Sequence, residues 1–306
     1  MATLRPQTPT PVAAPVEGSG RVLAAILITL LAWASAFIVI RGAGTEFTPG
    51  AMALGRLLVG AVCLSLLVLR RPLVRLTGRE WVLTAAFGIA WFAAYNVALN
   101  TAEQTLDAGT TAMIVNIGPI LIAVGAGLVL GEGIPRWLAI GAGVAFCGVL
   151  LIGISTGADG FGDISGILWC LVAAVTYAVG VLCQKPVLRR VSSTQLTWIG
   201  CVIGVVACLP YAGDLLRDVS TASTGSILGV VYLGAIPTAL AFTTWGFALS
   251  KMPAARLGVS TYVVPPLTII LGLIVFGEVP GPLAVIGGVV CLVGVALSRR
   301  SPRLPG

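Results

Sequence analysis

Residues 102–132 read AEQTLDAGTTAMIVNIGPILIAVGAGLVLGE, an apolar run with a proline near its middle and a glutamate at its end. Residues 248–278, ALSKMPAARLGVSTYVVPPLTIILGLIVFGE, repeat the pattern. In both copies the glutamate follows a proline by thirteen positions, as Glu132 follows Pro119. A repeat of about 146 residues is too long for a solenoid unit and amounts to half of the 306-residue chain. It predicts one helical bundle that has been duplicated, with function where the halves face each other.

The composition indicates a membrane protein. Hydrophobic residues make up 58% of the chain, charged residues 9%, and the mean hydropathy is +1.04. A soluble protein carries about 25% charged residues. The apolar runs are long and glycine-rich and lack the alternation of barrel strands, so helices are expected to satisfy the backbone in lipid. The fold class predicted is therefore an all-α integral membrane protein.

Enzyme chemistry is not expected. The chain has no histidine, which removes the usual general base and metal ligand. The seven cysteines lie inside apolar runs without metal-ligand spacing, so they are interpreted as small core residues, and neither a metal nor a cofactor is expected. The net charge of +7 is spread over short loops rather than gathered in a basic domain, so no nucleic-acid partner is expected.

A membrane span needs about 20 mostly apolar residues, and ten runs meet this length. Residues 1–20 are rich in Pro, Thr and Ala and are expected to form a disordered cytoplasmic tail, and 301–306 a short second tail. The expected spans are 22–40, 50–69, 81–101, 109–130, 137–155, 164–183, 195–212, 226–248, 257–276 and 281–298.

The basic residues test this count. With the amino terminus inside, fifteen of the eighteen basic residues lie on the cytoplasmic side, whereas the outer loops hold only Arg41 and Arg217. This asymmetry supports ten spans with both termini in the cytoplasm. Five spans per half place the second repeat, 157–300, upside down relative to the first, 21–156. Trp33 then matches Tyr177, and Arg41 matches Lys185.

Inverted repeats of this kind are common in secondary transporters, which bind substrate at the repeat interface. A membrane enzyme is disfavoured by the missing histidine and by the lack of paired acids in the spans. A non-transporting membrane scaffold is an alternative, although it would not need an inverted duplication. The expected partners are the lipid bilayer and a small-molecule substrate, and the sequence leaves the oligomeric state open.

Several motifs in order resemble the EamA-type members of the drug/metabolite transporter superfamily over 21–300. They are Trp33-Ala-Ser-Ala-Phe37, Pro49 with Arg56, Pro119…Gly131-Glu132, Pro265…Gly277-Glu278, and Pro237-Thr-Ala-Leu-Ala-Phe242-Thr-Thr-Trp245. The resemblance implies ten helices around a central cavity, alternating access in the cell membrane, and movement of small metabolites, often export of amino acids or related compounds. It does not identify the substrate. A drug or cation exporter is the alternative within this superfamily.

Arg56 is the one basic residue well inside an expected span. Seven residues past Pro49, it lies ~10 Å below the outer end at 1.5 Å per residue. A central arginine costs ~2.5–3.5 kcal/mol on insertion scales, so it must have a partner or face water. It is either a counter-charge for a substrate carboxylate or a structural residue bonded to helix-end carbonyls.

The remaining candidates for a cavity are polar and aromatic residues of the spans. Asn96 and Asn100 are four residues apart and share a face of the third span. A helix contact satisfies a buried amide as readily as a cavity does, so both interpretations stay open. The predicted set is Trp33, Ser35, Arg56, Trp91, Tyr95, Asn96, Asn100, Asn116, Tyr177, Thr238, Thr244, Trp245 and Tyr262.

Prolines and acids complete the expectations. Pro119, Pro265 and Pro266 interrupt long helices and free backbone carbonyls, either as hinges or as static kinks. Glu132 and Glu278 end helices on opposite faces, where they are expected to pair with basic residues or cap the next helix. No Asp or Glu lies deep in an expected span, which favours facilitated diffusion, exchange, or coupling that uses no buried acid.

Overall fold

The computed structural model describes residues 19–69, 72–130, 161–252, 254–278 and 280–298, with short pieces between 136 and 151. Every regular element in these ranges is helical. The elements are α1 Ser19–Ala43, α2 Pro49–Val68, α3 Gly78–Phe87, η1 Gly88–Ala94, α4 Tyr95–Ala102, α5 Ala108–Val115, α6 Gly118–Leu130, α8 Phe161–Val187, α9 Ser193–Cys208, η3 Leu209–Tyr211, α10 Ala212–Thr221, α11 Thr224–Leu233, η4 Gly234–Leu240, α12 Ala241–Lys251, α13 Ala254–Ser260, η5 Thr261–Val263, α14 Val264–Phe276 and α15 Pro282–Ser298.

Within the described residues, seven continuous helical stretches are long and apolar enough to cross a membrane. Two shorter apolar stretches, Thr261–Phe276 and Val285–Gly294, fall within the expected last two spans. The expected fifth span, 137–155, lies largely outside the described residues, as do the tail 1–18, Glu132 and residues 299–306. The expected seventh span, 195–212, is longer in the structure, because the 3-10 turn η3 carries the helix past Pro210 to Thr221.

Large apolar side chains cover the outside of the bundle. Leu66 of α2 is 63% exposed and Ile274 of α14 is 72% exposed, and similar leucines and isoleucines line α1 and α15. Water would make such a surface unstable, whereas lipid tails are as apolar as these side chains. The exposed surface is therefore suited to a bilayer.

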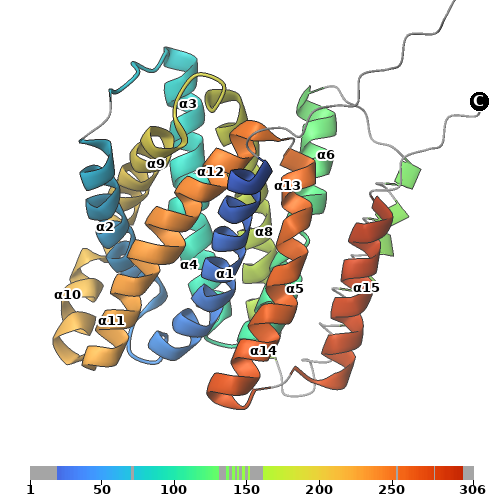
Figure 1. Ribbon diagram of the computed structural model, residues 1–306. Coiled ribbons are helices and arrows are strands. Elements are labelled where there is room, and N and C mark those ends of the chain that lie inside the picture. The colour runs from blue at the N-terminus through green and yellow to red at the C-terminus, as the bar shows by residue number, and fades with distance from the viewer. Residues whose placement is uncertain are drawn as a thin grey trace, which may run out of the picture.

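The two halves of the chain pack through each other rather than side by side. Helix α1 lies at the centre of Figure 1 and packs on α11, α12 and α14, all from the second half. Helix α8 of the second half packs on α3, η1, α4 and α6 of the first. The interface between halves is thus the core of the bundle.

The helices keep the register of the sequence repeat. The π-helical segment η1 starts at Gly88, and the second one, η4, starts at Gly234, 146 positions later (234 − 88). Both segments have seven residues and lie inside the third span of their half. A π segment is rare and local, so its recurrence at this offset supports a duplicated bundle.

Each half also contains a break in its fourth span. Helix α5 ends at Val115 and α6 begins at Gly118, so the break comes just before Pro119 rather than at it. In the second half the 3-10 turn η5 precedes α14, whose first turn contains Pro265 and Pro266. Because proline is tolerated in the first turn of a helix, these prolines start the second helix of each broken pair.

The matched basic residues Arg41 and Lys185 bond equivalent carbonyls. Arg41 Nη1 donates to the main-chain oxygen of Glu103 at 3.0 Å, just past the end of α4. Lys185 Nζ donates to the main-chain oxygen of Leu249 at 2.5 Å, near the end of α12. Leu249 lies 146 positions after Glu103 (249 − 103). Each cation satisfies carbonyls that a helix end leaves without an intrahelical donor.

Candidate functional site

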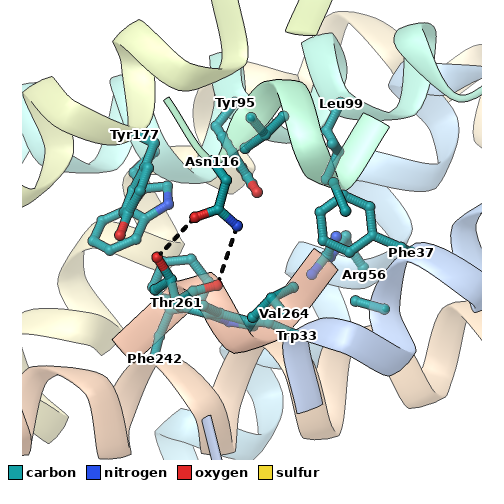
Figure 2. A pocket seen from close by; sticks show the side chains of 14 residues that line it. Trp33, Phe37, Arg56, Tyr95, Leu99, Asn116, Tyr177, Phe242, Thr261 and Val264 are labelled. Carbon is teal, nitrogen blue, oxygen red and sulfur yellow. Dashed lines mark hydrogen bonds between the residues drawn. The ribbon is translucent and has the colours of Figure 1, made fainter. Parts of the chain in front are cut away.

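A cavity of about 590 Å³, part of it continuous with solvent, lies between the two halves. Figure 2 shows side chains from several helices that surround it. The lining residues are Trp33, Ala36, Phe37, Arg56, Trp91, Tyr95, Leu99, Ala112, Val115, Asn116, Tyr177, Phe242, Thr261 and Val264.

One wall of the cavity is aromatic. The rings of Trp91 and Tyr177 lie 4.9 Å apart between centroids, and those of Trp91 and Phe242 lie 4.8 Å apart. Trp33 makes an edge contact with Tyr177 at 6.5 Å and lies 4.9 Å from Trp245. Tilted and edge contacts at these distances hold the rings in place. The wall is therefore a rigid apolar surface that both halves contribute.

Arg56 supplies the positive charge of the cavity wall. Its side chain is on α2 and the residue is 3% exposed. Its Nε donates to Thr238 Oγ1 at 3.2 Å, and no other hydrogen bond joins the guanidinium to the described residues. The two terminal nitrogens keep their donors for another acceptor, and a guanidinium matches a carboxylate in both charge and shape.

The π segment η4 prepares the acceptor for Arg56. Pro237 has no N–H, so the carbonyl of Leu233, four residues earlier, lacks its α-helical donor. Thr238 Oγ1 donates to that carbonyl at 2.8 Å. A hydroxyl has one hydrogen to donate, so Thr238 can only accept from Arg56 Nε. This arrangement fixes the orientation of the guanidinium.

Asn116 and Thr261 bridge the two helix breaks across the cavity. Asn116 Nδ2 donates to the main-chain oxygen of Thr261 at 3.1 Å. The Thr261 hydroxyl lies 2.6 Å from the carbonyl of Gly258 and 3.3 Å from Asn116 Oδ1, and its single hydrogen serves one of these two acceptors at a time. Figure 2 draws both contacts between Asn116 and Thr261 beside Tyr177 and Val264. The contact joins the expected fourth span to the expected ninth span beside the cavity.

Six of the residues expected in a cavity line this one. They are Trp33, Arg56, Trp91, Tyr95, Asn116 and Tyr177. Two further expected residues contact lining residues. Thr238 accepts a hydrogen bond from Arg56, and the ring of Trp245 packs against the ring of Trp33. Tyr262 follows Thr261 in the turn η5.

The other expected residues make helix contacts. Asn96 Nδ2 donates to the carbonyl of Phe92 at 2.7 Å within its own helix, and Asn100 Nδ2 donates to Pro49 at 3.0 Å. Ser35 bonds Tyr232 at 2.7 Å, and Thr244 bonds Thr29 at 2.8 Å. Buried polar side chains were expected either to line the cavity or to join two helices. Ser35, Asn100 and Thr244 join two helices.

Sequence reasoning missed the apolar part of the lining. The residues are Ala36, Phe37, Leu99, Ala112, Val115, Phe242 and Val264, and the polar Thr261 was missed as well. Most are alanines, leucines and valines that are indistinguishable from core residues in a sequence of this composition. Phe37 and Phe242 belong to the motifs quoted above, and this membership was the one feature of the sequence that could have identified them as lining residues.

A buried acid was also missed. Glu103 follows α4 and is 3% exposed, and neither carboxylate oxygen has a hydrogen-bond partner in the described part of the chain. Glu278 pairs with Arg41, whose Nη2 lies 3.0 Å from Glu278 Oε1. The expectation that Glu278 pairs with a basic residue is thus met by Arg41, at the end of α1.

Many apolar helices around a cavity with one charged group and an aromatic wall define a multi-pass membrane transporter for small molecules. No group of three or more metal-ligating residues occurs among the described residues. The EamA-like transporter family model matches the chain twice, at 20–154 and 164–300. The chain belongs to the EamA-like transporter family, as the motifs indicated.

Relatives of known name agree with this membership. A protein of Streptantibioticus cattleyicolor named "Probable terminal-alkyne amino-acid exporter" is 31% identical over 90% of this chain and 92% of its own. An uncharacterised transporter of Bacillus subtilis is also 31% identical, over 87% of both chains. The "Probable amino-acid metabolite efflux pump" of Salmonella typhimurium is 23% identical over 92% of this chain and 97% of its own.

A solved structure shares the fold. Its TM-score is 0.61 at 19% identity, and the match covers 92% of this chain and 96% of the other. The two proteins therefore share their fold over nearly the whole length of both chains.

Proposed function

We propose that this protein exports small carboxylate-bearing metabolites with an apolar body, such as apolar amino acids, across the cytoplasmic membrane. The observation that carries the proposal is Arg56, whose terminal guanidinium nitrogens are left without acceptors in the described chain at the wall of an otherwise uncharged cavity. A buried cation in such surroundings is stabilised by an anion. A substrate carboxylate at Arg56 places its apolar part against the rings of Trp91 and Tyr177.

The relatives support both the substrate class and the direction. Two of them carry names that refer to export or efflux of amino acids or their metabolites. An amino acid with an apolar side chain has one carboxylate for Arg56 and an apolar body for the aromatic wall. Its ammonium group finds the face of an aromatic ring or a carbonyl freed at the breaks before Pro119 and Pro265.

The transport cycle proposed is alternating access between ten helices arranged as two inverted five-helix repeats, 21–156 and 157–300. The 146-residue offset of η1 and η4 supports this arrangement, as do the equivalent carbonyl contacts of Arg41 and Lys185. The basic residues favour both termini in the cytoplasm. The contacts of Arg41 then lie at the outer end of the bundle, and those of Lys185 at the inner end.

A cationic drug is the second candidate cargo, because aromatic faces attract organic cations. Trp33, Trp91 and Phe242 form such a surface in the cavity. The positive charge of Arg56 opposes it. A carboxylate with an apolar body therefore fits both Arg56 and the aromatic wall, whereas an organic cation fits the aromatic wall alone.

The test is counterflow in proteoliposomes loaded with apolar, acidic and basic amino acids and with organic cations. We expect accelerated exchange of apolar amino acids by the wild-type protein and loss of it in Arg56→Gln. Thr238→Val, which removes the acceptor of Arg56 Nε together with the hydroxyl that donates to the Leu233 carbonyl, serves as the graded variant, with reduced exchange expected. Exchange of cations alone, unaffected or improved by Arg56→Gln, would favour the second candidate.

A further inference from the structure

Glu103 is a buried acid that the proposed binding of substrate does not use. It lies at the end of the bundle where α1, α4 and α14 finish, which is called the Arg41 end below. The residue is 3% exposed and both carboxylate oxygens lack hydrogen-bond partners among the described residues. An ionised carboxylate in such a place loses its hydration and gains no bond in return. A protonated carboxyl avoids that loss.

Arg41 holds the three helix ends together without bonding the Glu103 carboxylate. Its Nε and Nη2 donate to Glu278 Oε1 at 3.1 and 3.0 Å, and its Nη1 donates to the main-chain oxygen of Glu103. The Asp107 carboxylate is also occupied, because it accepts from the N–H and hydroxyl of Thr110. The charged and titratable groups that face Glu103 are Arg41, Arg56, Tyr95, Asp107, Cys170 and Glu278.

These neighbours favour the neutral acid. Burial raises the pKa of Glu103 well above its usual value, and the charges of Asp107 and Glu278 raise it further against Arg41 and Arg56. Losing the proton would leave three carboxylates around Arg41. The cost is relieved when water reaches the site.

The repeat shows that the carboxyl is not needed to build this helix end. Lys185 bonds the main-chain oxygen of Leu249 just as Arg41 bonds that of Glu103. Leu249 is fully buried and apolar. A leucine thus completes the equivalent contact at the opposite end, so an acid at Glu103 is unexplained by packing.

We propose that Glu103 is a proton-binding site whose loss of the proton opens the Arg41 end of the bundle. In the closed state the carboxyl holds its proton. When the O–H bond breaks, the proton passes to water at that end, and hydration of the carboxylate favours separation of α1, α4 and α14. Opening and proton release are therefore linked, and each favours the other. The role in transport rests on the proposed function above.

Cys170 reports this opening without any added residue. It is fully buried on α8 beside the Glu103 site. Its labelling by a water-soluble maleimide, located by peptide mass spectrometry and divided by the rate in unfolded protein at the same pH, measures the open fraction. Cys201, also fully buried but bonded to Leu57 on another part of the bundle, is the matched internal control.

In wild type we expect the corrected labelling of Cys170 to rise about tenfold per pH unit, because opening releases one proton. The rise begins above the usual glutamate pKa and levels off above the raised pKa of closed Glu103. Cys201 should stay flat. Glu103→Gln, which cannot ionise, should keep Cys170 protected at every pH.

Glu46→Gln is the control variant. Glu46 accepts from Ser223 at the same end, and these hydrogen bonds hold its pKa below the usual value, so the rise should be unchanged. Infrared titration of the wild-type protein gives a second readout: a protonated-carboxyl band that persists above the usual glutamate pKa. Absence of that band, or an identical Cys170 rise in Glu103→Gln, would overturn the proposal.

Neither readout uses a substrate, so the two proposals fail separately. A titrating Cys170 together with no amino-acid exchange rejects the proposed cargo and keeps the proton site. Amino-acid exchange together with a pH-independent Cys170 rejects the proton site and keeps the cargo.

Discussion

Arg56 Nε donates to Thr238 Oγ1 over 3.2 Å, a bond that joins α2 of the first half to the π segment η4 of the second. The bond holds the Nε side of the buried Arg56 guanidinium at Thr238, so that its other side is oriented toward the cavity. Because Pro237 has no N–H for the Leu233 carbonyl, the Thr238 hydroxyl donates to that carbonyl and can only accept from Arg56. The orientation of the Arg56 guanidinium therefore depends on Leu233, Pro237 and Thr238 across the interface. Several expectations depend on this arrangement.

Arg56→Lys keeps the charge and loses both the planar fork and the bond to Thr238. A charge-assisted hydrogen bond contributes about 1.5–3 kcal/mol, so the apparent affinity for an apolar amino acid should fall by roughly 10- to 100-fold. Concentration-dependent exchange in proteoliposomes measures this. Equal affinity at equal protein incorporation would show that Arg56 serves the fold and not the substrate.

Pro237→Ala restores an N–H four residues after Leu233. We expect the helix to take up the normal bond, so that Thr238 no longer needs to donate to Leu233 and its hydroxyl can turn away from Arg56. Exchange should decrease while thermal stability stays level or increases, because an interior proline costs a helix about 3 kcal/mol. A parallel fall of stability and exchange would instead mean that the π segment is required for folding.

Gly180 allows α8 to approach η1. A Cβ at this position would lie 2.6 Å from Trp91 Cβ, an atom fixed to the backbone, so the two helices would have to separate. Gly180→Ala should cost about 1–3 kcal/mol, as overpacked cores do, and displace Trp91 from the aromatic wall. Gly213→Ala, where a Cβ meets nothing within 4 Å, is the matched control. Thermal unfolding in detergent and tryptophan fluorescence report both effects.

Asn116→Ala and Thr261→Val remove the two ends of the bond across the helix breaks. Because Asn116 also bonds the Thr261 main chain, the asparagine change should destabilise more, by about 1–3 kcal/mol against about 0.5–1.5 kcal/mol. A double-mutant cycle on unfolding free energy should show coupling. Strictly additive effects would mean that the hydroxyl–amide bond makes no contribution.

The repeat was readable because its features recur at one offset. The second copy of the proline and glutamate predicted two related halves, and the π segments 146 positions apart agree with it. Arg56 could be singled out because a cation in an apolar run is chemically conspicuous. The EamA membership followed from motif order and is confirmed by the family match.

Other features could not be predicted, for a physical reason. Leu99 and Val115 line the cavity by their place in three dimensions, and their residue types are the same as those of the core. Glu103 stands one residue past a helix, where a sequence predicts a solvated loop. Arg41 of α1 bonds its main-chain oxygen and Cys170 of α8 lies nearby, so its burial depends on tertiary packing.

The measurement that tests the central claim most directly compares two cargos that differ only in the carboxylate: phenylalanine and phenethylamine, in counterflow proteoliposomes. The account predicts exchange of phenylalanine that is lost in Arg56→Gln and little exchange of phenethylamine by the wild-type protein. Equal exchange of both compounds, with Arg56→Gln unchanged, would contradict a carboxylate site at Arg56.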